Sequence, residues 1–568
     1  MQRRLIQLKF TGILLGMVLA ASATGQEATP LMPLHHGETI SLFTDRSFYV
    51  TGEEVALSAF YEKPEAAGED PWSTVLYTEL IRWDGTKLAR GKFPIVNGRA
   101  RGVLTIPSNL ISGNYYLRAY TRWMRNFDPL TYTYKTLTVL NPEKAEVDKG
   151  PENGEDPAEI DSRVSCQEIP FRLSGLQDSY APRSRAEMDI ELPEQFSRQS
   201  FTLSVTRKTP GGSPDASIRF VPETNRDTTE PVTYYPEING LTVSGKVIGE
   251  ENREPVEGVK VDLSSFSDSF YYYAMLSDEN GAFYFTLPAI RGTHEFHISV
   301  ERDSGPKNEI LVENEYCNKP VTLPWTPFQL DEEDRAQAEE LALNAQLQQR
   351  FAHTWGNGDS LDYGPGTFYG RPSSTVYVED YIELTDLREF FFELVRDVSI
   401  GYTRREPDRL EVNSSGSLQF FPPLVLMDNI PVANDKRLLR IPSRRIEHIE
   451  VVNQGYVLGD FKHSGVISIF SKNNDMAGLQ TDRDSYFFEY TLFGNDDISL
   501  PPPGGEADSR TPLRRNLLYW NPELEISSGS PVPVTFITPD APGTYVVRIQ
   551  GLNDQGQPIH WEQSFVVE

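Results

Sequence analysis

The chain has 568 residues, of which 82 are acidic and 53 are lysine or arginine, so its formal net charge is −29. A surface this acidic repels a polyanion over most of its area, which excludes nucleic acid as the expected partner. The length predicts several domains, and 38% hydrophobic residues with 41 glycines and 41 prolines favour turn-rich β domains over disorder. The predicted fold class is mainly β, with several immunoglobulin-like β-sandwiches, one α+β domain and a short linking helix.

Residues 1–23 have the pattern of a secretory signal peptide. Arg3, Arg4 and Lys9 precede an apolar core at 13–20, and small residues follow that core. No later apolar run reaches the roughly 18 residues of a membrane-spanning helix. We therefore expect an exported protein of the periplasm or outer membrane, with no transmembrane helix after signal removal.

Residues 36–141 predict a β-sandwich. Val55, Leu57 and Ala59 alternate with their neighbours as the inward face of a strand does. Turn signals such as the Asn97-Gly98 dipeptide separate these short apolar runs.

Within this region, Asp45–Val55 and Ser112–Leu117 resemble the MG2-type domain of alpha-2-macroglobulin-like proteins. Those inhibitors depend on a thioester that is built from a Cys-Gly-Glu-Gln segment. Neither Ser165–Glu168 nor Tyr316–Asn318 supplies that segment. The resemblance therefore implies a macroglobulin-like domain without covalent trapping of a protease.

Residues 142–167 are rich in acids, glycine and proline, and they predict a solvated linker. The strand patterns over 168–235 amount to about half of a β-sandwich, which would leave an apolar face uncovered. The immunoglobulin-like strands predicted over 512–568 could complete it as one discontinuous domain, with the modules between them inserted. The alternative is that the two segments form two separate small domains.

Residues 240–322 resemble the carboxypeptidase regulatory-like domain. The resemblance rests on Val243–Ile248, Glu254–Val261 and Ser277–Phe285, which contain turn and strand signals in the expected order. It implies a seven-stranded β-sandwich with no catalysis of its own.

A helix is predicted from Asp331 to Phe351, within a helical linker at 323–360. Acidic residues crowd its first turn, where the helix dipole favours them. Leu343, Leu347 and Phe351 recur at four-residue spacing and predict the face that packs.

Residues 366–475 resemble the plug domain of TonB-dependent outer-membrane receptors. The resemblance rests on Pro423–Pro431, Arg445–Val452 and Ser464–Lys472. Asn429 stands where the receptor pattern usually has glycine, and asparagine tolerates the left-handed conformation nearly as well. We assign a structural or partner-binding role to the motif residues Pro423, Asp428, Asn429, Pro431, Ile446, Glu447, Ile449, Glu450, Val451, Gly465, Val466 and Ile467.

A 22-stranded transporter barrel needs roughly 220 residues in its strands alone. Only 94 residues follow Asn474. We therefore expect a plug-like module that does not carry its own pore.

Cys166 and Cys317 are the only cysteines, and they do not make a metal site. In an oxidising compartment they could pair and tie the second domain to the end of the third, or they could stay unpaired. His294 and His297 lie on a predicted strand at odd separation, so they face opposite sides and cannot share a metal. No catalytic residue, metal ligand set or cofactor is predicted.

Trp72, Trp83, Trp123, Tyr116 and Tyr120 could bind carbohydrate if they were exposed on the first domain. Aromatic residues at strand spacing also form cores and cross-strand pairs. The sequence leaves both interpretations open.

The sequence predicts a non-enzymatic cell-envelope binding or scaffold protein, accessory to outer-membrane uptake or assembly, which recognises a protein partner through its sandwich and plug-like modules. One alternative is a component of a TonB-dependent transport system whose barrel is another chain; co-purification with a barrel protein would distinguish it. A macroglobulin-like protease binder without the thioester is another, and it would form protease-dependent complexes. An enzyme with a hidden carboxylate pair would be revealed by screening against peptides and glycans.

Overall fold

The computed structural model is mainly β, as the sequence predicts, with three α-helices among the residues it describes. The signal-peptide prediction and Cys166 lie outside the described residues. No helix in the described part of the chain is long and apolar enough to cross a membrane. The described residues are 37–568 apart from 65–67, 69–70, 152–166, 169–170, 193–198, 212–216, 221–231, 266–270, 301–306, 352–366, 403–406, 415, 433, 480–483, 499, 501–511, 528 and 554.

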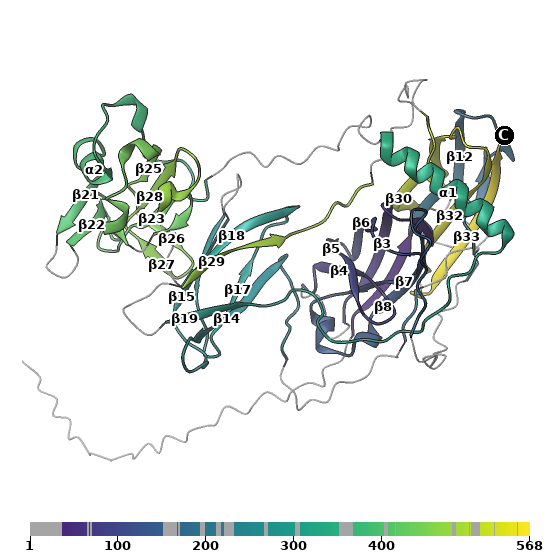
Figure 1. The fold of residues 1–568 in the computed structure, drawn as a ribbon, viewed down its shortest axis with the longest axis horizontal. Helices are drawn as coiled ribbons and strands as arrows, with labels where there is room; N and C mark the ends of the chain where they lie inside the picture. The colour runs from purple at the N-terminus through teal and green to yellow at the C-terminus, as the bar shows by residue number, and fades with distance from the viewer. Residues whose placement is uncertain are drawn as a thin grey trace, which may run out of the picture.

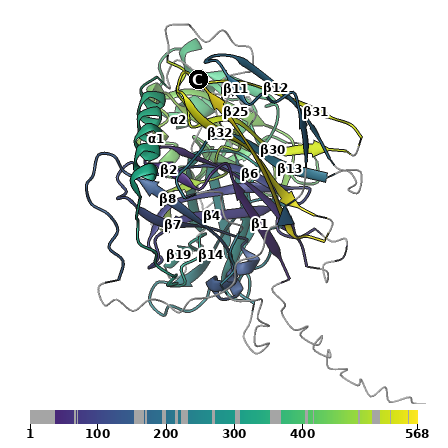
Figure 2. The ribbon, with the colours of Figure 1, turned by 90° about the vertical axis from the view of Figure 1, so that its right-hand side faces the viewer.

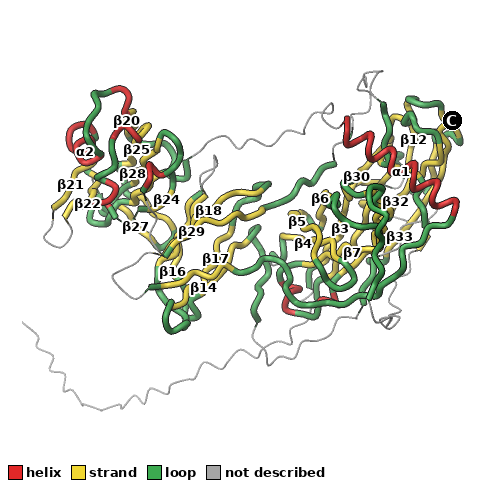
Figure 3. The backbone as a smooth tube through the Cα atoms, in the orientation of Figure 1, coloured by secondary structure: helices red, strands yellow, loops and turns green. Residues whose placement is uncertain are grey.

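The modules follow one another along the long axis of the molecule (Figure 1). The plug-like domain lies at one end, and the first and second sandwiches lie at the other, with helix α1 (Glu332–Phe351) beside them. The third sandwich lies between the two ends. The α-helices are confined to the two ends (Figure 3), so the middle of the molecule is built from strands.

The strands of the first sandwich are hydrogen-bonded to one another in the order β1-β3-β6-β5-β4-β7-β8-β2, so they form one sheet of eight strands. Val55, Leu57 and Ala59 are fully buried in its core, as their alternation predicts. Asn97 and Gly98 adopt φ of 51° and 73° and connect β5 to β6. Its strands are β1 (Thr39–Thr44), β2 (Phe48–Val50), β3 (Glu54–Glu62), β4 (Val75–Ile81), β5 (Lys87–Val96), β6 (Arg99–Thr105), β7 (Gly113–Tyr120) and β8 (Thr133–Leu140), with the short 3₁₀ helices η2 (Trp123–Asn126) and η3 (Pro129–Thr131) between β7 and β8.

The aromatic residues of this sandwich are packing residues. Tyr120 is fully buried, Tyr116 is 6% exposed and Trp123 is 7% exposed. The rings of Trp72 and Trp123 meet edge to face at 5.5 Å, and Trp83 packs against the core. The structure therefore favours the packing interpretation and contradicts carbohydrate binding by this set.

Within the predicted linker at 142–167, Val147 and Asp148 contact the first sandwich. Val147 bridges to Ser112, and the buried Asp148 carboxylate lies 2.9 Å from the Arg82 guanidinium. An ion pair and a strand bridge hold Val147 and Asp148 against the first sandwich, and composition does not reveal the partner of Asp148.

The second sandwich is formed by two segments of the chain. Strand β13 lies between β30 and β32, and strand β12 lies between β10 and β31. These pairings place 168–207 and 517–567 in one discontinuous domain with a shared core. Its strands are β9 (Gln167–Glu168), β10 (Arg172–Ser174), β11 (Ser179–Tyr180), β12 (Arg185–Glu191), β13 (Gln199–Arg207), β30 (Leu517–Ile526), β31 (Val532–Ile537), β32 (Gly543–Leu552) and β33 (Pro558–Val567).

The predicted end of this domain at residue 235 is too late. The amide of Tyr134 in β8 donates to the carbonyl of Ile218 at 2.8 Å. The Tyr77 hydroxyl donates to the buried carboxylate of Glu237 at 2.9 Å. The described residues between 217 and 237 thus pack on the first sandwich instead of the second.

The third sandwich has seven strands in two sheets, β17-β14-β19 and β16-β15-β18-β29. The predicted boundary at residue 322 omits β29, which returns after the plug-like domain and pairs with β18. The plug-like domain is therefore inserted into the third sandwich. The strands are β14 (Thr242–Gly249), β15 (Lys260–Ser265), β16 (Tyr272–Leu276), β17 (Ala282–Thr286), β18 (Thr293–Val300), β19 (Asn308–Val312) and β29 (Ser485–Thr491).

Helix α1 packs beside β2 at the end of the molecule (Figure 2). The predicted packing stripe is wrong, because Leu343 is 41% exposed. The buried side chains are instead Ala338, Leu341, Ala342 and Ala345, which contact Phe48 and Val50 of β2. Small side chains on this face allow the helix to approach the sandwich closely.

The plug-like domain contains one five-stranded sheet and two hairpins. Asp386 caps helix α2 by accepting a hydrogen bond from the amide of Glu389 at 3.0 Å. Its elements are β20 (Ser374–Tyr377), η5 (Val378–Asp380), α2 (Leu387–Leu394), β21 (Val398–Tyr402), β22 (Pro407–Val412), β23 (Leu424–Met427), β24 (Ile430–Pro431), α3 (Asp435–Leu438), η6 (Ser443–Arg445), β25 (Ile446–Val452), β26 (Tyr456–Leu458), β27 (Phe461–His463), β28 (Val466–Ser471) and η7 (Met476–Gly478).

A buried carboxyl group lies at the start of the first sandwich. Glu38 is fully buried and accepts hydrogen bonds from the hydroxyls of Ser73 at 2.6 Å and Tyr61 at 2.9 Å, and from Thr121. Burial raises the pKa of Glu38 to about 7, although these hydroxyl donors favour the charged form. The folded protein therefore binds a proton here at pH values where the unfolded chain has lost it.

We expect Glu38→Gln to remove a pH-dependent contribution to stability. Because the folded pKa is raised, the wild type becomes less stable as pH rises from about 4.5 to about 7. The free energy of unfolding of the variant, relative to that of the wild type, should rise over this window. At pH values above the window this relative gain should amount to about 3 kcal/mol. Urea unfolding of both proteins between about pH 5 and pH 8 measures the difference. The exposed Glu143→Gln is the control, and a difference for Glu38→Gln that stays constant with pH would contradict the prediction.

Candidate partner-binding cleft

The plug-like sheet brings the three predicted motif segments together. Its strand order is β20-β25-β28-β23-β24, and β23 runs parallel to β28 while the other neighbours are antiparallel. One face of this sheet packs against α2 around a core that includes Phe390 and Phe391. The motif residues therefore lie on adjacent strands of one small α+β domain.

Asp428 and Asn429 form the turn between β23 and β24. Both adopt positive φ, 47° and 66°, which suits a tight hairpin turn. The buried Asp428 carboxylate accepts hydrogen bonds from the amide of Ser471 at 2.6 Å and the amide of Met476 at 2.7 Å. It also accepts from the Ser471 hydroxyl at 2.6 Å. This aspartate fixes the end of β28 and is a structural residue.

The apolar motif residues are core residues. Ile446, Ile449, Val451 and Ile467 are fully buried between the sheet and α2. Val466 is also fully buried, but it belongs to the cluster on the opposite face. None of these five side chains is available to a partner.

Gly465 is required by close packing of two strands. A Cβ atom at this position would lie 2.2 Å from the carbonyl oxygen of Val452. A larger residue would separate β25 from β28 where they begin to pair, so the glycine too is structural.

The remaining motif residues reach the surface or the neighbouring domain. Glu447 is exposed on β25, whereas the Glu450 carboxylate accepts a hydrogen bond from the Tyr369 hydroxyl at 2.6 Å. Pro423 and Pro431 are half-buried and line a cleft against the third sandwich. Of the predicted partner-binding residues, these two prolines line this cleft.

The opposite face of the plug-like sheet docks on strand β16. Leu424, Leu426 and Val466 pack with Tyr272 and Tyr369 in one buried cluster. The Tyr272 hydroxyl also donates to the buried Asp262 carboxylate at 2.6 Å, which joins this apolar contact to β15.

Beside this contact the two domains leave a cleft of about 1410 Å³. Its walls come from β15, β18 and the loop after β14 on one side and from β23, β24, α3 and β27 on the other. Phe421 is 40% exposed and lines the cleft. The Lys462 ammonium lies 5.9 Å from the centre of the Phe421 ring. Pockets for small molecules span about 300–1000 Å³, so this cleft is large enough for a polypeptide segment.

Both signs of charge line the cleft. A binding surface of this kind suits a partner that carries charged and apolar groups in alternation, as a polypeptide does. The acidic lining residues are Glu250, Glu251, Asp262, Asp408, Asp435 and Asp460, and the basic ones are Lys260, Lys307, Arg409, Lys436, Arg437 and Lys462.

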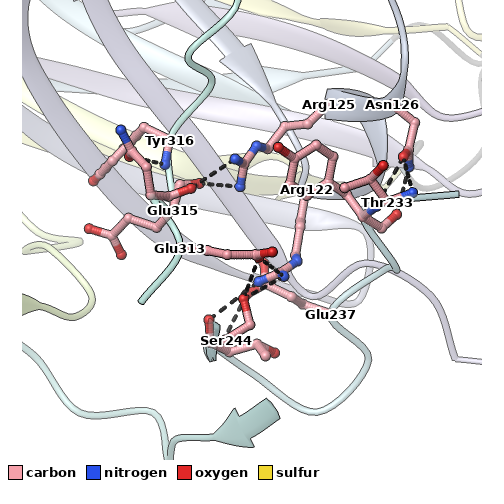
Figure 4. A network of polar contacts seen from close by, with 12 residues as sticks. Arg122, Arg125, Asn126, Thr233, Glu237, Ser244, Glu313, Glu315 and Tyr316 are labelled. Carbon is pink, nitrogen blue, oxygen red and sulfur yellow. Dashed lines mark hydrogen bonds and ion pairs between the residues drawn. The ribbon is translucent and has the colours of Figure 1, made fainter. Parts of the chain in front are cut away.

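A polar network holds the third sandwich against the first (Figure 4). The Arg122 guanidinium donates to the Ser244 hydroxyl at 2.8 Å and lies 3.2 Å from the Glu313 carboxylate. The Arg125 guanidinium donates to the carbonyl of Glu315 at 2.8 Å. These directional contacts join η2 and the residue before it to the start of β14 and to the segment directly after β19, so the cleft is carried on a sandwich that is itself fixed in place.

The other predicted chemical groups do not assemble into a site. His297 is buried with its ring 4.8 Å from that of Phe487, and burial lowers its pKa to about 4. His294 instead lies 2.7 Å from the carbonyl of Arg291. The thiol of Cys317 is buried, with the Tyr132 hydroxyl 3.6 Å from its sulfur. Within the described ranges, no three His, Cys, Asp or Glu side chains are grouped so as to hold a metal ion.

Sequence reasoning missed Phe421, Lys462 and Leu276 as lining residues of the cleft. They belong to two modules that the sequence treats separately, so no motif joins them. The exposed aromatic pair Phe420 and Phe421, directly before two prolines, is the local signal that could have indicated this surface.

Comparisons with known proteins give no family for the chain. No protein-family model matches it, and a search of curated proteins gives no match. Among solved structures, native alpha-2-macroglobulin of Escherichia coli aligns at 10% identity over 94% of this chain and 40% of that chain, with a TM-score of 0.23. Methylamine-reacted alpha-2-macroglobulin of Salmonella aligns at 11% identity over 94% and 40%, also with a TM-score of 0.23.

Dimeric latent PorU of Porphyromonas gingivalis aligns at 10% identity over 51% of this chain and 34% of that chain, with a TM-score of 0.15. This chain spans about 40% of the length of the macroglobulin chains. TM-scores this low do not establish a shared fold, so neither architecture nor function is transferred from these proteins.

We expect opposite effects from changes at the two residues of the β23–β24 turn. Asp428→Ala leaves buried donors of Ser471 and Met476 unpaired and should cost about 2–4 kcal/mol. Asn429→Gly should be neutral or stabilise by up to about 1 kcal/mol, because glycine adopts positive φ freely. Hydrogen exchange of the β28 amides measures local stability in both variants. Faster exchange in Asn429→Gly, or unchanged exchange in Asp428→Ala, would contradict this account of the turn.

Proposed function

We propose that this protein is a non-enzymatic binding or scaffold protein of the cell envelope, which recognises a protein partner at the cleft between its plug-like domain and its third sandwich. The export signal expected over residues 1–23 supports the envelope location. The macroglobulin-like resemblance of residues 36–141 supports a role in protein recognition. Accessory service to outer-membrane uptake or assembly follows from the plug-like resemblance.

The observation that carries the proposal is the cleft itself. It is lined by two domains whose relative position is fixed by a buried apolar contact through Tyr272 and Leu424. A preformed cleft binds without the entropic cost of ordering its walls. The half-exposed Phe421 supplies an aromatic side chain of the kind that dominates binding energy at protein interfaces.

The plug motif supports recognition more than gating. Most of its residues are used within the domain as core, turn or strand contacts, and Pro423 and Pro431 line the cleft. A rigid proline pair beside an aromatic residue gives a surface with little side-chain entropy to lose on binding.

We expect Phe421→Ala to weaken binding of the partner by about tenfold or more, because it removes an aromatic contact at the cleft. A tagged full-length chain is crosslinked in native envelope fractions, and affinity for the captured protein is then measured for each variant. Phe392→Ala is the matched control, since Phe392 is 78% exposed on α2 and does not line the cleft. Equal affinity for the wild type and Phe421→Ala would reject the cleft as the binding site. Capture of a barrel protein that depends on Phe421 would indicate an uptake role for the same cleft.

A further inference from the structure

Strand β29 is the last strand of its sheet, and no described strand pairs with its outer edge. It has seven residues, Ser-Tyr-Phe-Phe-Glu-Tyr-Thr, of which four are aromatic. Proteins usually shorten, charge or cover an edge of this kind, because its unpaired amides attract another strand. The edge of β29 contains neither proline nor lysine.

The hydrogen bonds at the two ends of β29 show which of its amides face outward. The amide of Val300 donates to the carbonyl of Asp484 at 3.1 Å, and the amide of Leu492 donates to the carbonyl of Gly292 at 2.8 Å. In an antiparallel ladder, bonded pairs alternate with pairs that make no bond to each other. With the register of β18 and β29, the N–H and C=O groups of Glu489 and Thr491 therefore point away from β18.

A like-charge pair lies at the same place. Glu489 is directly opposite Glu295 of β18, and both are exposed. They form a non-bonded pair of the ladder, in which side chains approach more closely than in a bonded pair. No described lysine or arginine forms an ion pair with either carboxylate. Like charges directly opposite each other destabilise a sheet, so a cation placed beside this pair would stabilise it.

We propose that the outer edge of β29 accepts an extended segment of a partner polypeptide as an added strand, with a lysine or arginine side chain next to Glu489. The outward amides of Glu489 and Thr491 supply main-chain hydrogen bonds, which give affinity for any strand. The carboxylates of Glu489 and Glu295 select a basic side chain at one register position. Ser485 at the start of β29 lines the cleft, but Glu489, Thr491 and Glu295 do not, so the inference does not rest on the proposed function.

The test uses the full chain and two short synthetic peptides of alternating valine and threonine, one with a central lysine and one with a central glutamate. We expect the lysine peptide to bind about tenfold more tightly. Glu489→Lys should reverse that preference, and its Tm should be unchanged or higher because it replaces a like-charge pair. Glu447→Lys, the same charge change on exposed β25, should leave the preference as it is.

Two further measurements separate strand addition from simple charge attraction. The lysine peptide should slow hydrogen exchange at the amides of Glu489 and Thr491. Glu489→Pro removes one outward donor without removing a bond to β18, and it should abolish binding of both peptides. The proposal is overturned if neither peptide binds, if Glu489→Lys keeps the preference of the wild type, or if binding leaves these two amides unprotected. Phe421→Ala should not alter peptide binding, so loss of the cleft function and loss of this one are distinguishable.

Discussion

The pairing of β13 with β30 and β32 is the constraint on which the architecture depends. It closes the second sandwich with strands that come about 310 residues later in the chain. The third sandwich is also completed by a late strand, since β29 pairs with β18 after the plug-like domain. Each inserted module is tethered at both ends, and this limits how far it can rotate relative to its host.

The tethers do not set the orientation of the modules. Buried polar groups of the first sandwich, which bond to the segment that follows β19, help to set it. Within the first sandwich, the Arg118 guanidinium donates to the fully buried Glu79 carboxylate at 2.8 Å. The Tyr120 hydroxyl donates to the same carboxylate and accepts from the amide of Cys317 at 2.8 Å. Removing one member would leave a buried charge uncompensated, at a cost of about 3–5 kcal/mol. Such bonds require one register between the sandwiches, which non-directional apolar contact would not.

The sequence predicts the features that local physics decides. Alternation at Val55, Leu57 and Ala59 indicates an inward strand face, and Asp428-Asn429 indicates a hairpin turn. Features that depend on distant partners are not readable in this way. The spacing of Leu343 predicts that it packs, yet it is exposed in the structure. The face of α1 that packs against β2 is made mainly of alanines instead.

In the candidate site, too, local features are readable from the sequence and contacts between domains are not. The plug motif was readable because its residues serve their own domain, which is also why most of them are buried. The cleft was not readable, since Phe421 and Leu276 become neighbours only through the docking of two domains. The ion pair of Asp148 is not readable for a related reason: its partner Arg82 lies 66 positions away, and composition carries no information about pairing.

The docking of the plug-like domain on the third sandwich covers one face of its sheet. Leu424, Leu426 and Val466 form an apolar face of its sheet, and such a face requires a cover in water. Tyr272 of the third sandwich and Tyr369 supply that cover, so this sheet is complete within the chain. The apolar contact therefore fixes the plug-like domain on the third sandwich, and the cleft beside it depends on that contact.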